Sequence, residues 1–409
     1  MATQSTIRID LDALEANLRA IGAHCGGGPE RICAVVKADA YGLGAGRIAG
    51  AMGRIGIESF ATYGPQEALE VGDATTRGWV LVLMPVRELS RDTRTTALLG
   101  RGRLHFSAHD LQQVRDLEAE ADRLGVVLPL HLELETGMGR GGTDAEEAEA
   151  ILRLIDGSCR LRLAGVFTHL PDAVDDPVSA INRGRVLESF LSGVRDLVPA
   201  DAVRHVAATA SLESRSLLFD QVRVGLGWVG HGIRTLAGRP DPISLVPIVS
   251  WWSKVIRVRR LPAGSSVGYG CTVRTTRETV AGIVPVGYAD GLPSVPGEEN
   301  HQVVVHGKGG PIVVPVLGRM NMDQFVVDLT DVGPCADEIP VEILSADPES
   351  PASLDRVAAR AGVSPYQLLC GIGSRVPRLL VTGRSLSPAM PVAERNASAV
   401  QDDRRSIGQ

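Results

Sequence analysis

Lysine is scarce in this chain of 409 residues: only three of its 42 basic residues are lysines, and the rest are arginines. Chemistry that needs a lysine amine is therefore confined to Lys37, Lys254 and Lys308. Basic residues do not dominate either, because the formal net charge is −6, which argues against nucleic acid as a main partner. Hydrophobic residues make up 44% of the chain and aromatic residues 4%, a globular composition that leaves small molecules as the open class of partner.

Paired cysteines and long apolar runs are missing as well. The six cysteines form no CxxC pair and have no metal-ligand spacing with the nine histidines, so the sequence predicts neither a disulfide framework nor a metal site. No apolar run has the length of a membrane span, and no apolar segment follows a basic stretch near the N-terminus. We therefore expect a cytoplasmic protein without a membrane segment or a secretion signal.

A chain of this length predicts two domains. In its first part, short apolar runs alternate with amphipathic helical patterns. The strand-like runs are Ile32–Val36, Ile57–Tyr63, Trp79–Met84, Arg103–Ser107, Leu128–Leu134, Leu161–His169, Val203–Ala208 and Val222–Leu226. Eight strands that alternate with helices predict a (β/α)8 barrel of the TIM type, and a doubly wound open sheet is the alternative.

The pattern changes near residues 238–242. Beyond them, strand-like runs separated by Gly and Pro turns predict a mostly antiparallel β domain, which one helix at about Ser353–Ala361 interrupts. We place the barrel at residues 1–240, the β domain at 241–384 and a flexible tail at 385–409. The first strand, TIRID, can belong to the β domain instead of the barrel.

Lys37 directly follows the apolar run Ile32–Val36, at the expected carboxyl end of a barrel strand. Barrel active sites lie at this face, and an apolar wall lowers the pKa of a lysine and leaves its amine able to act as a nucleophile. The alternative is a strand-end lysine whose amine simply reaches solvent, and for an isolated lysine this is the more common case.

Polar residues gather at the ends of the later strands. They are Glu133, Glu135, Arg140, His169, Thr209, Arg223 and Gly225. A single strand-end histidine is more often structural, but several such residues converging on one lysine are hard to explain as packing. The loops after the last two strands of a barrel often bind phosphate, and Thr209 with the backbone of Gly225 and Leu226 suits an anion.

Three segments of the β domain also stand out: VGYGCT at 267–272, GYADGL at 287–292 and GRMNMDQ at 318–324. Their spacing alone favours hairpin turns on which the tyrosines pack. Two of the five tyrosines of the chain, Tyr269 and Tyr288, nonetheless lie in these segments.

Together these segments resemble the alanine racemases, which are fold-type III pyridoxal phosphate enzymes. The resemblance runs from about Thr6 to Arg384 and rests on eight motifs in family order: AVVKADAYGLG, HLELETGMGR, GVFTHL, VRVGLG, AGSSVGYG, IVPVGYADGL, GRMNMDQ and SRVPR. It implies pyridoxal phosphate as the cofactor, a homodimer with shared active sites, and interconversion of L- and D-alanine.

The resemblance also implies a role for each matching residue. Lys37 would form a Schiff base with the cofactor and act as one of two bases, and Tyr269 of the partner subunit would be the other. Arg223 would bind the pyridine nitrogen, with His169 in the network behind it. The cofactor phosphate would be held by Tyr41, Thr209, Gly225 and Leu226.

On the substrate side, Arg140 would bind the cofactor's phenolic oxygen and the substrate carboxylate. The site would be completed by Met322, Tyr288 and Arg319 for the substrate, Ser374 beside the cofactor, and Asp323 in support.

Three departures from the family pattern lead to expectations of their own. Glu133 stands where many members have a carbamylated lysine, so we expect a Glu133–Arg140 ion pair. Ser374 replaces a tyrosine that narrows the cavity, which favours a roomier or more polar pocket, open to serine or a larger amino acid. Leu43 replaces a histidine of the lysine motif and is expected to lie outside the chemistry.

Other functions compete with alanine racemisation. One is racemisation or epimerisation of serine or a larger amino acid in a biosynthetic pathway. Another is decarboxylation by a fold-type III enzyme, a family that uses an acidic partner for the pyridine nitrogen, so Arg223 argues against it. A third is non-catalytic cofactor binding, but those relatives resemble the barrel alone, whereas this chain adds a β domain with Tyr269.

Overall fold

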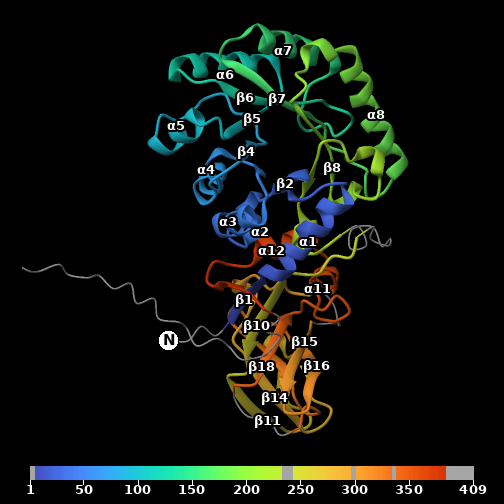
Figure 1. The fold of residues 1–409 in the computed structure, drawn as a ribbon. Helices are drawn as coiled ribbons and strands as arrows, with labels where there is room; N and C mark the ends of the chain where they lie inside the picture. The colour runs from blue at the N-terminus through green and yellow to red at the C-terminus, as the bar shows by residue number, and fades with distance from the viewer. Residues whose placement is uncertain (1–4, 233–242, 296–300, 334–337, 384–409) are drawn as a thin grey trace, which may run out of the picture.

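The computed structural model describes residues 5–232, 243–295, 301–333 and 338–383. They form a closed barrel and a β domain beside it (Figure 1). The boundary expected at residue 240 and the tail expected at 385–409 lie outside the described residues. Within the described ranges, no helix combines the length and the apolar character needed to cross a membrane.

Eight parallel strands close the barrel, because each strand pairs with the next and β9 pairs with β2. They are β2 (Ile32–Val35), β3 (Ser59–Thr62), β4 (Trp79–Val82), β5 (Leu104–Ala108), β6 (Leu128–Glu133), β7 (Leu161–Phe167), β8 (Val203–Ala208) and β9 (Gln221–Val224). Their largely buried apolar runs are typical of parallel strands that are covered on both faces. The (β/α)8 barrel is confirmed, and the open-sheet alternative is wrong.

Helices lie outside these strands (Figure 1). They are α1 (Leu11–His24), α2 (Lys37–Gly42), α3 (Ala45–Ile55), α4 (Pro65–Ala74), α5 (Thr93–Gly100), α6 (Leu111–Leu124), α7 (Ala145–Gly157), α8 (Pro177–Gly193) and α9 (Leu226–Val229). Helix α6 shows why the sequence folds this way. The Asp110 side chain accepts a hydrogen bond from the Gln113 N–H at its start, Val114 and Leu117 are buried, and Gly125 ends it at φ 68°.

The β domain is built on a nine-stranded sheet in the order β11-β14-β17-β16-β15-β18-β10-β1-β19. Its strands are β1 (Ser5–Asp10), β10 (Val249–Lys254), β11 (Arg257–Leu261), β14 (Thr279–Val284), β15 (Gln302–Gly307), β16 (Gly310–Leu317), β17 (Phe325–Asp328), β18 (Pro340–Leu344) and β19 (Arg378–Val381). Only β1 and β19 pair in parallel, and β1 pairs antiparallel with β10, so the first strand of the chain belongs to this sheet. A separate hairpin joins β12 (Ser266–Val267) and β13 (Val273–Arg274).

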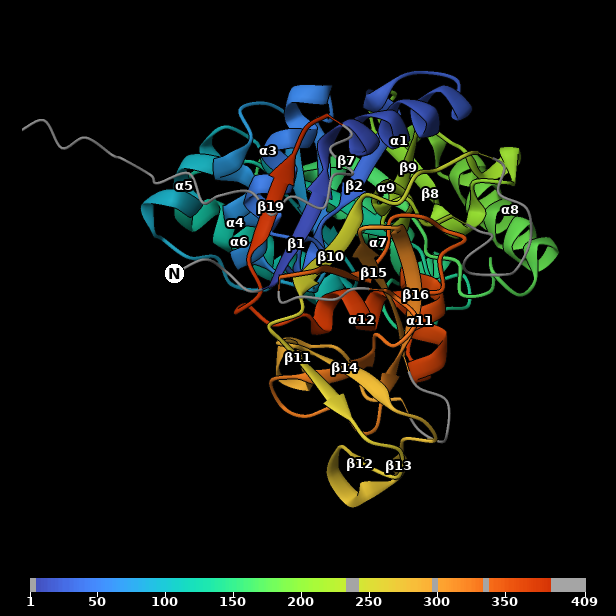
Figure 2. The same ribbon diagram turned by 90° about the horizontal axis from the view of Figure 1, so that it is seen from below.

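Two helices lie where the β domain meets the barrel (Figures 1 and 2). Helix α11 (Leu354–Ala361) follows Ser353, in agreement with the helix expected there. Helix α12 (Pro365–Gly371) was not expected, because seven residues are too few to show helical periodicity. The side chain of Ser364 caps its first turn by accepting from the Gln367 N–H.

Candidate active site

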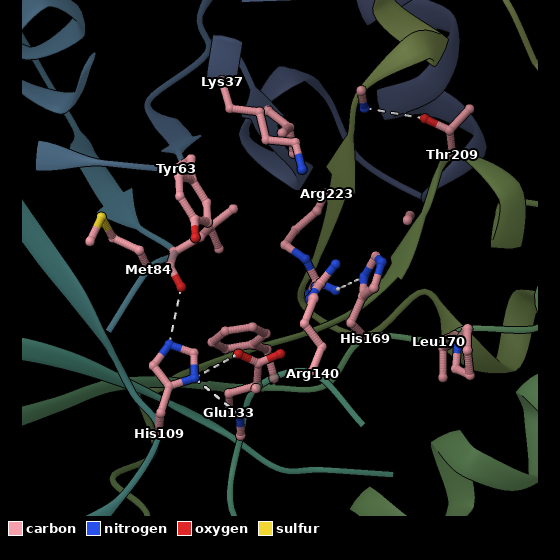
Figure 3. A pocket seen from close by; sticks show the side chains of 18 of the residues that line it. Lys37, Tyr63, Met84, His109, Glu133, Arg140, His169, Leu170, Thr209 and Arg223 are labelled. Carbon is pink, nitrogen blue, oxygen red and sulfur yellow. Dashed lines mark hydrogen bonds and ion pairs between the residues drawn. The ribbon is translucent and has the colours of Figure 1, made fainter. Parts of the chain in front are cut away.

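A cavity of about 1030 Å³ opens at the carboxyl ends of the barrel strands (Figure 3). Its lining includes eight of the residues singled out in the sequence: Lys37, Tyr41, Glu133, Arg140, His169, Thr209, Arg223 and Gly225. Residues far apart in the chain meet here because all the strands of a parallel barrel end at the same face. Helix α12 adds Tyr366 and Cys370 to the lining.

Lys37 begins an unusual turn that follows β2. The four residues from Ala38 to Tyr41 all have φ between 51° and 59°, in the left-handed region, where each non-glycine residue costs roughly 1–2 kcal/mol. The turn is held by hydrogen bonds from the Ala40 N–H to the Val36 oxygen (2.9 Å) and from the Ala45 N–H to an Asp39 carboxylate oxygen (2.6 Å). Strain of this kind concentrates at functional sites. Burial and the neighbouring Arg140 charge lower the pKa of the Lys37 amine.

Thr209, Gly225 and Tyr41 form a small polar cradle on one side of the cavity. The Thr209 hydroxyl accepts hydrogen bonds from the N–H groups of Gly225 and Gly227, each at 3.2 Å. Glycine is needed at position 225, because a Cβ there would lie only 2.5 Å from the Tyr41 hydroxyl. Because the N–H groups of Gly225 and Gly227 already donate to Thr209, the hydroxyls of Thr209 and Tyr41 are the groups that can donate to an anion such as a phosphate here.

The fourth residue expected at the cradle, Leu226, is fully buried and does not itself line the cavity. Its backbone forms a hydrogen bond with the Tyr366 hydroxyl. The Tyr366 ring also packs edge-on against Tyr41 at 5.4 Å. Tyr366, which the sequence argument missed, therefore completes the wall of the cradle.

Arg223 is a buried guanidinium, 5% exposed, at the floor of the cavity. It donates to the backbone oxygens of Thr168 (2.7 Å) and Val206 (3.2 Å), and it contacts Nδ1 of His169 at 3.5 Å. Burial lowers its pKa to about 10, so the group stays cationic at neutral pH. Burial, followed by the Arg223 charge, lowers the pKa of His169 to about 3, so the imidazole beside this arginine is neutral.

Three buried histidines extend from Arg223 through the barrel interior. Arg223 Nη1 lies 3.1 Å from His205 Nδ1, His205 Nε2 lies 2.9 Å from His131 Nδ1, and His131 Nε2 lies 2.9 Å from His105 Nδ1. The chain ends where His105 Nε2 lies 3.2 Å from the Gly102 carbonyl oxygen. Because arginine can only donate and the carbonyl can only accept, every histidine carries its hydrogen on Nε2 and accepts at Nδ1. This chain was not expected from the sequence, because its histidines come from three different strands, β5, β6 and β8.

The histidine chain makes stability depend on pH. Burial lowers the pKa of His105 to about 3, against 6.5 in the unfolded chain, so the unfolded chain binds more protons below pH 6.5. His105 should therefore remove about 1.4 kcal/mol of unfolding free energy per pH unit as the pH falls from about 6 towards 3. Urea unfolding of wild type and His105→Gln at several pH values measures this. The variant should show the shallower slope, and equal slopes would contradict a neutral His105.

Glu133 does not form the expected ion pair with Arg140. Its Oε2 lies 3.1 Å from Nδ1 of His109 instead, and the two side chains face each other in Figure 3. The strand register explains this, because Ala108 pairs with Leu132, which places His109, just after β5, beside Glu133, the last residue of β6. Arg140 affects Glu133 as a nearby charge: burial raises the pKa of Glu133, and His109, Arg223 and Arg140 oppose that rise.

The residues expected from the β domain lie elsewhere. Tyr269 is 72% exposed, Met322 54% and Tyr288 48%, and the lining of the cavity contains none of them, nor Arg319. They are close together, because the Ala289 N–H bonds to the Met322 oxygen and a Cβ on Gly268 would lie 2.8 Å from the Arg319 nitrogen. These side chains therefore lie together on the surface of the β domain.

Three further expected positions lie outside the cavity lining. Ser374 is exposed, so a single chain does not place it against the cavity, contrary to the contact we expected. Asp323, next to Met322, pairs with Arg375 at 2.7 Å. Leu43 is buried in the core, away from the cavity lining.

A barrel that carries a lysine, a buried arginine and a polar cradle at its strand ends, followed by a β domain, has the plan of an enzyme whose active site lies at the carboxyl ends of the strands. Residues 9–232 match the family model for the alanine racemase N-terminal domain, and residues 248–380 match the model for the alanine racemase C-terminal domain. The chain therefore belongs to the alanine racemase family. It is an isomerase of the amino-acid racemase type.

Similar proteins agree with this assignment. The alanine racemase of Symbiobacterium thermophilum is 32% identical over 374 residues, which cover 90% of this chain and 95% of that protein. The crystal structure of alanine racemase from D-cycloserine-producing Streptomyces lavendulae has a TM-score of 0.80 at 29% identity, covering 94% of this chain and 98% of that one. The alanine racemase from Bartonella henselae, solved with covalently bound pyridoxal phosphate, shares the fold, with a TM-score of 0.76 at 24% identity and coverage of 93% and 100%.

Proposed function

We propose that this protein is a pyridoxal phosphate-dependent racemase that interconverts L- and D-alanine. One observation carries the proposal: the Lys37 amine enters the same cavity as the buried Arg223 and the cradle of Tyr41, Thr209 and Gly225. The distribution of groups suits a phosphorylated pyridine aldehyde, which needs an amine, a ring-nitrogen partner and an anion site. Membership of the alanine racemase family supports the choice of substrate.

The residues of the cavity fit pyridoxal phosphate chemically. Lys37 has a lowered pKa, which leaves more of its amine unprotonated and able to attack an aldehyde. Arg223 would donate a hydrogen bond to the ring nitrogen without releasing its own proton, since its pKa of about 10 stays above neutral pH. The cofactor, when bound, supplies an electron sink for the negative charge that forms at the substrate Cα.

Racemisation needs a proton removed from one face of Cα and returned to the other. Lys37 would serve one face from within the cavity. For the other face we propose Tyr269 of the partner subunit in a homodimer, because Tyr269 is exposed and a single chain does not place it in the cavity. The exposed group of Tyr269, Tyr288, Arg319 and Met322 would then close the site of the second protomer, and Arg140 would bind the substrate carboxylate.

One experiment tests the function directly. The protein is loaded with pyridoxal phosphate and incubated in D2O with single L-amino acids, while α-proton exchange and optical rotation are followed. We expect exchange at Cα together with loss of optical rotation for L-alanine. Exchange without any loss of optical rotation would contradict racemisation, and release of carbon dioxide would indicate the decarboxylase instead.

A larger or more polar substrate is the second candidate. One sequence feature favours it: Ser374 stands where many family members have a bulkier tyrosine, although in the single chain Ser374 lies outside the cavity lining. Turnover of D- and L-serine and of longer amino acids, measured beside alanine in the same assay, decides between the candidates. A strict preference for alanine would count against the larger substrate.

A further inference from the structure

The His109–Glu133 contact lies in the cavity wall at the ends of β5 and β6. His109 Nδ1 and Glu133 Oε2 are 3.1 Å apart, and both side chains are less than a tenth exposed. On the far side of the ring, His109 Nε2 lies 3.0 Å from the Leu83 carbonyl oxygen. A carbonyl oxygen can only accept, so His109 carries a hydrogen on Nε2.

This arrangement requires a proton between the two side chains. A neutral His109 with its hydrogen on Nε2 has a lone pair on Nδ1, which would repel an ionised carboxylate at 3.1 Å. Either the proton lies on Glu133 and is donated to Nδ1, or it lies on Nδ1 and is donated to Glu133. The Gly142 N–H, 3.0 Å from Nδ1, would share the single lone pair of that nitrogen with the Glu133 O–H in the first form, whereas in the second form it would face a hydrogen, so it favours the first form. In both forms the pair has no net charge.

Cationic groups surround this pair. Burial has the largest effect and raises the Glu133 pKa, which favours a held proton, whereas the charges of His109, Arg223 and Arg140 oppose that rise. Glu135 is the other carboxylate that acts on it. Further along the same wall, Arg87, Asp110 and Glu147 line the cavity.

We propose that His109 and Glu133 hold one proton between them, and that this neutral dyad leaves Arg140 free to bind the substrate carboxylate. The inference rests on the proposed function, in which Arg140 has that role. When Glu133 loses its proton as the pH rises, the pair becomes an anion beside Arg140. The anion attracts the guanidinium and repels a carboxylate ligand, so carboxylate binding weakens. His109 thus acts as a positioning residue through Glu133.

Propionate is a suitable probe, because it carries a carboxylate but has no amine to react. We expect the propionate Kd of the cofactor-loaded protein, measured by calorimetry, to rise about tenfold as the pH rises and Glu133 loses its proton. In Glu133→Gln, the amide N–H can donate to His109 Nδ1 at every pH and mimics the protonated carboxyl. This variant should bind propionate like the wild type at low pH, and its propionate Kd should not increase as the pH rises.

Glu147→Gln is the matched control, because it removes a carboxylate from the same wall, where Glu147 instead accepts from Thr143 and Leu111. In this variant the propionate Kd should increase with pH as it does in the wild type. NMR of isotope-labelled histidine and of the Glu133 carboxyl gives a second readout. A neutral His109 beside an ionised Glu133 at pH 7 would overturn the dyad. So would a propionate Kd that still increases with pH in Glu133→Gln. Neither readout requires turnover, so a protein that fails to racemise alanine while showing this pH dependence would contradict only the proposed function.

Discussion

Lys37→Ala is expected to lower racemisation by at least about 10³-fold, because the amine would both hold the cofactor covalently and serve as a base. Wild-type protein that is treated with borohydride after loading should retain pyridoxal phosphate on the peptide that contains Lys37. The variant should retain none. Mass spectrometry of the digested protein locates the modification, and polarimetry with L-alanine measures the rate.

Lys308→Ala is a matched control for the loss of a lysine. Lys308 is exposed in the turn between β15 and β16, and it is not one of the residues that line the cavity. The variant should bind cofactor and turn over alanine like the wild type. Cofactor attached by borohydride to Lys254 or Lys308, or a Lys37→Ala variant with near-normal racemisation, would contradict the assignment of the amine.

The sequence was sufficient for the fold because the two periodicities are strong. Each barrel strand is a short buried apolar run, and each long helix, such as α6, has an apolar face at helical spacing. Strand ends then brought Lys37, His169 and Arg223 to one face, as barrel topology requires. Helix α12 was not predicted because it is short. Its two residues in the cavity lining, Tyr366 and Cys370, were therefore not predicted either.

Side-chain partners were harder to predict than strand ends. Glu133 contacts His109 instead of Arg140 because of the register between β5 and β6. No local sequence pattern predicts that register. Closure of the barrel brings together His105, His131 and His205, whose side chains come from β5, β6 and β8 and meet inside it. The left-handed turn after Lys37 could not be predicted from the sequence either, because alanine has no preference for positive φ. Tertiary packing imposes that conformation.

Tyr269→Phe should lower racemisation by about 10²-fold or more, since one face of the substrate Cα would lose its base. Lys37 would still exchange the proton on its own face. In D2O, one enantiomer of alanine should therefore exchange its α-proton without racemising, whereas the other should exchange slowly. Tyr269 is 72% exposed, so removal of its hydroxyl should leave the fold of the single chain intact. Equal exchange of both enantiomers would contradict a base at this position.

A mixture of Lys37→Ala and Tyr269→Phe proteins tests whether the site is shared between protomers. If Lys37 works with Tyr269 of the partner subunit, a mixed dimer contains one site with both residues intact and one with neither. Random reassembly makes half of the dimers mixed, so activity should return to about a quarter of the wild-type value. If both residues acted within one protomer, every site would carry one defect. The mixture would then stay as inactive as its parents, which would rule out the shared site.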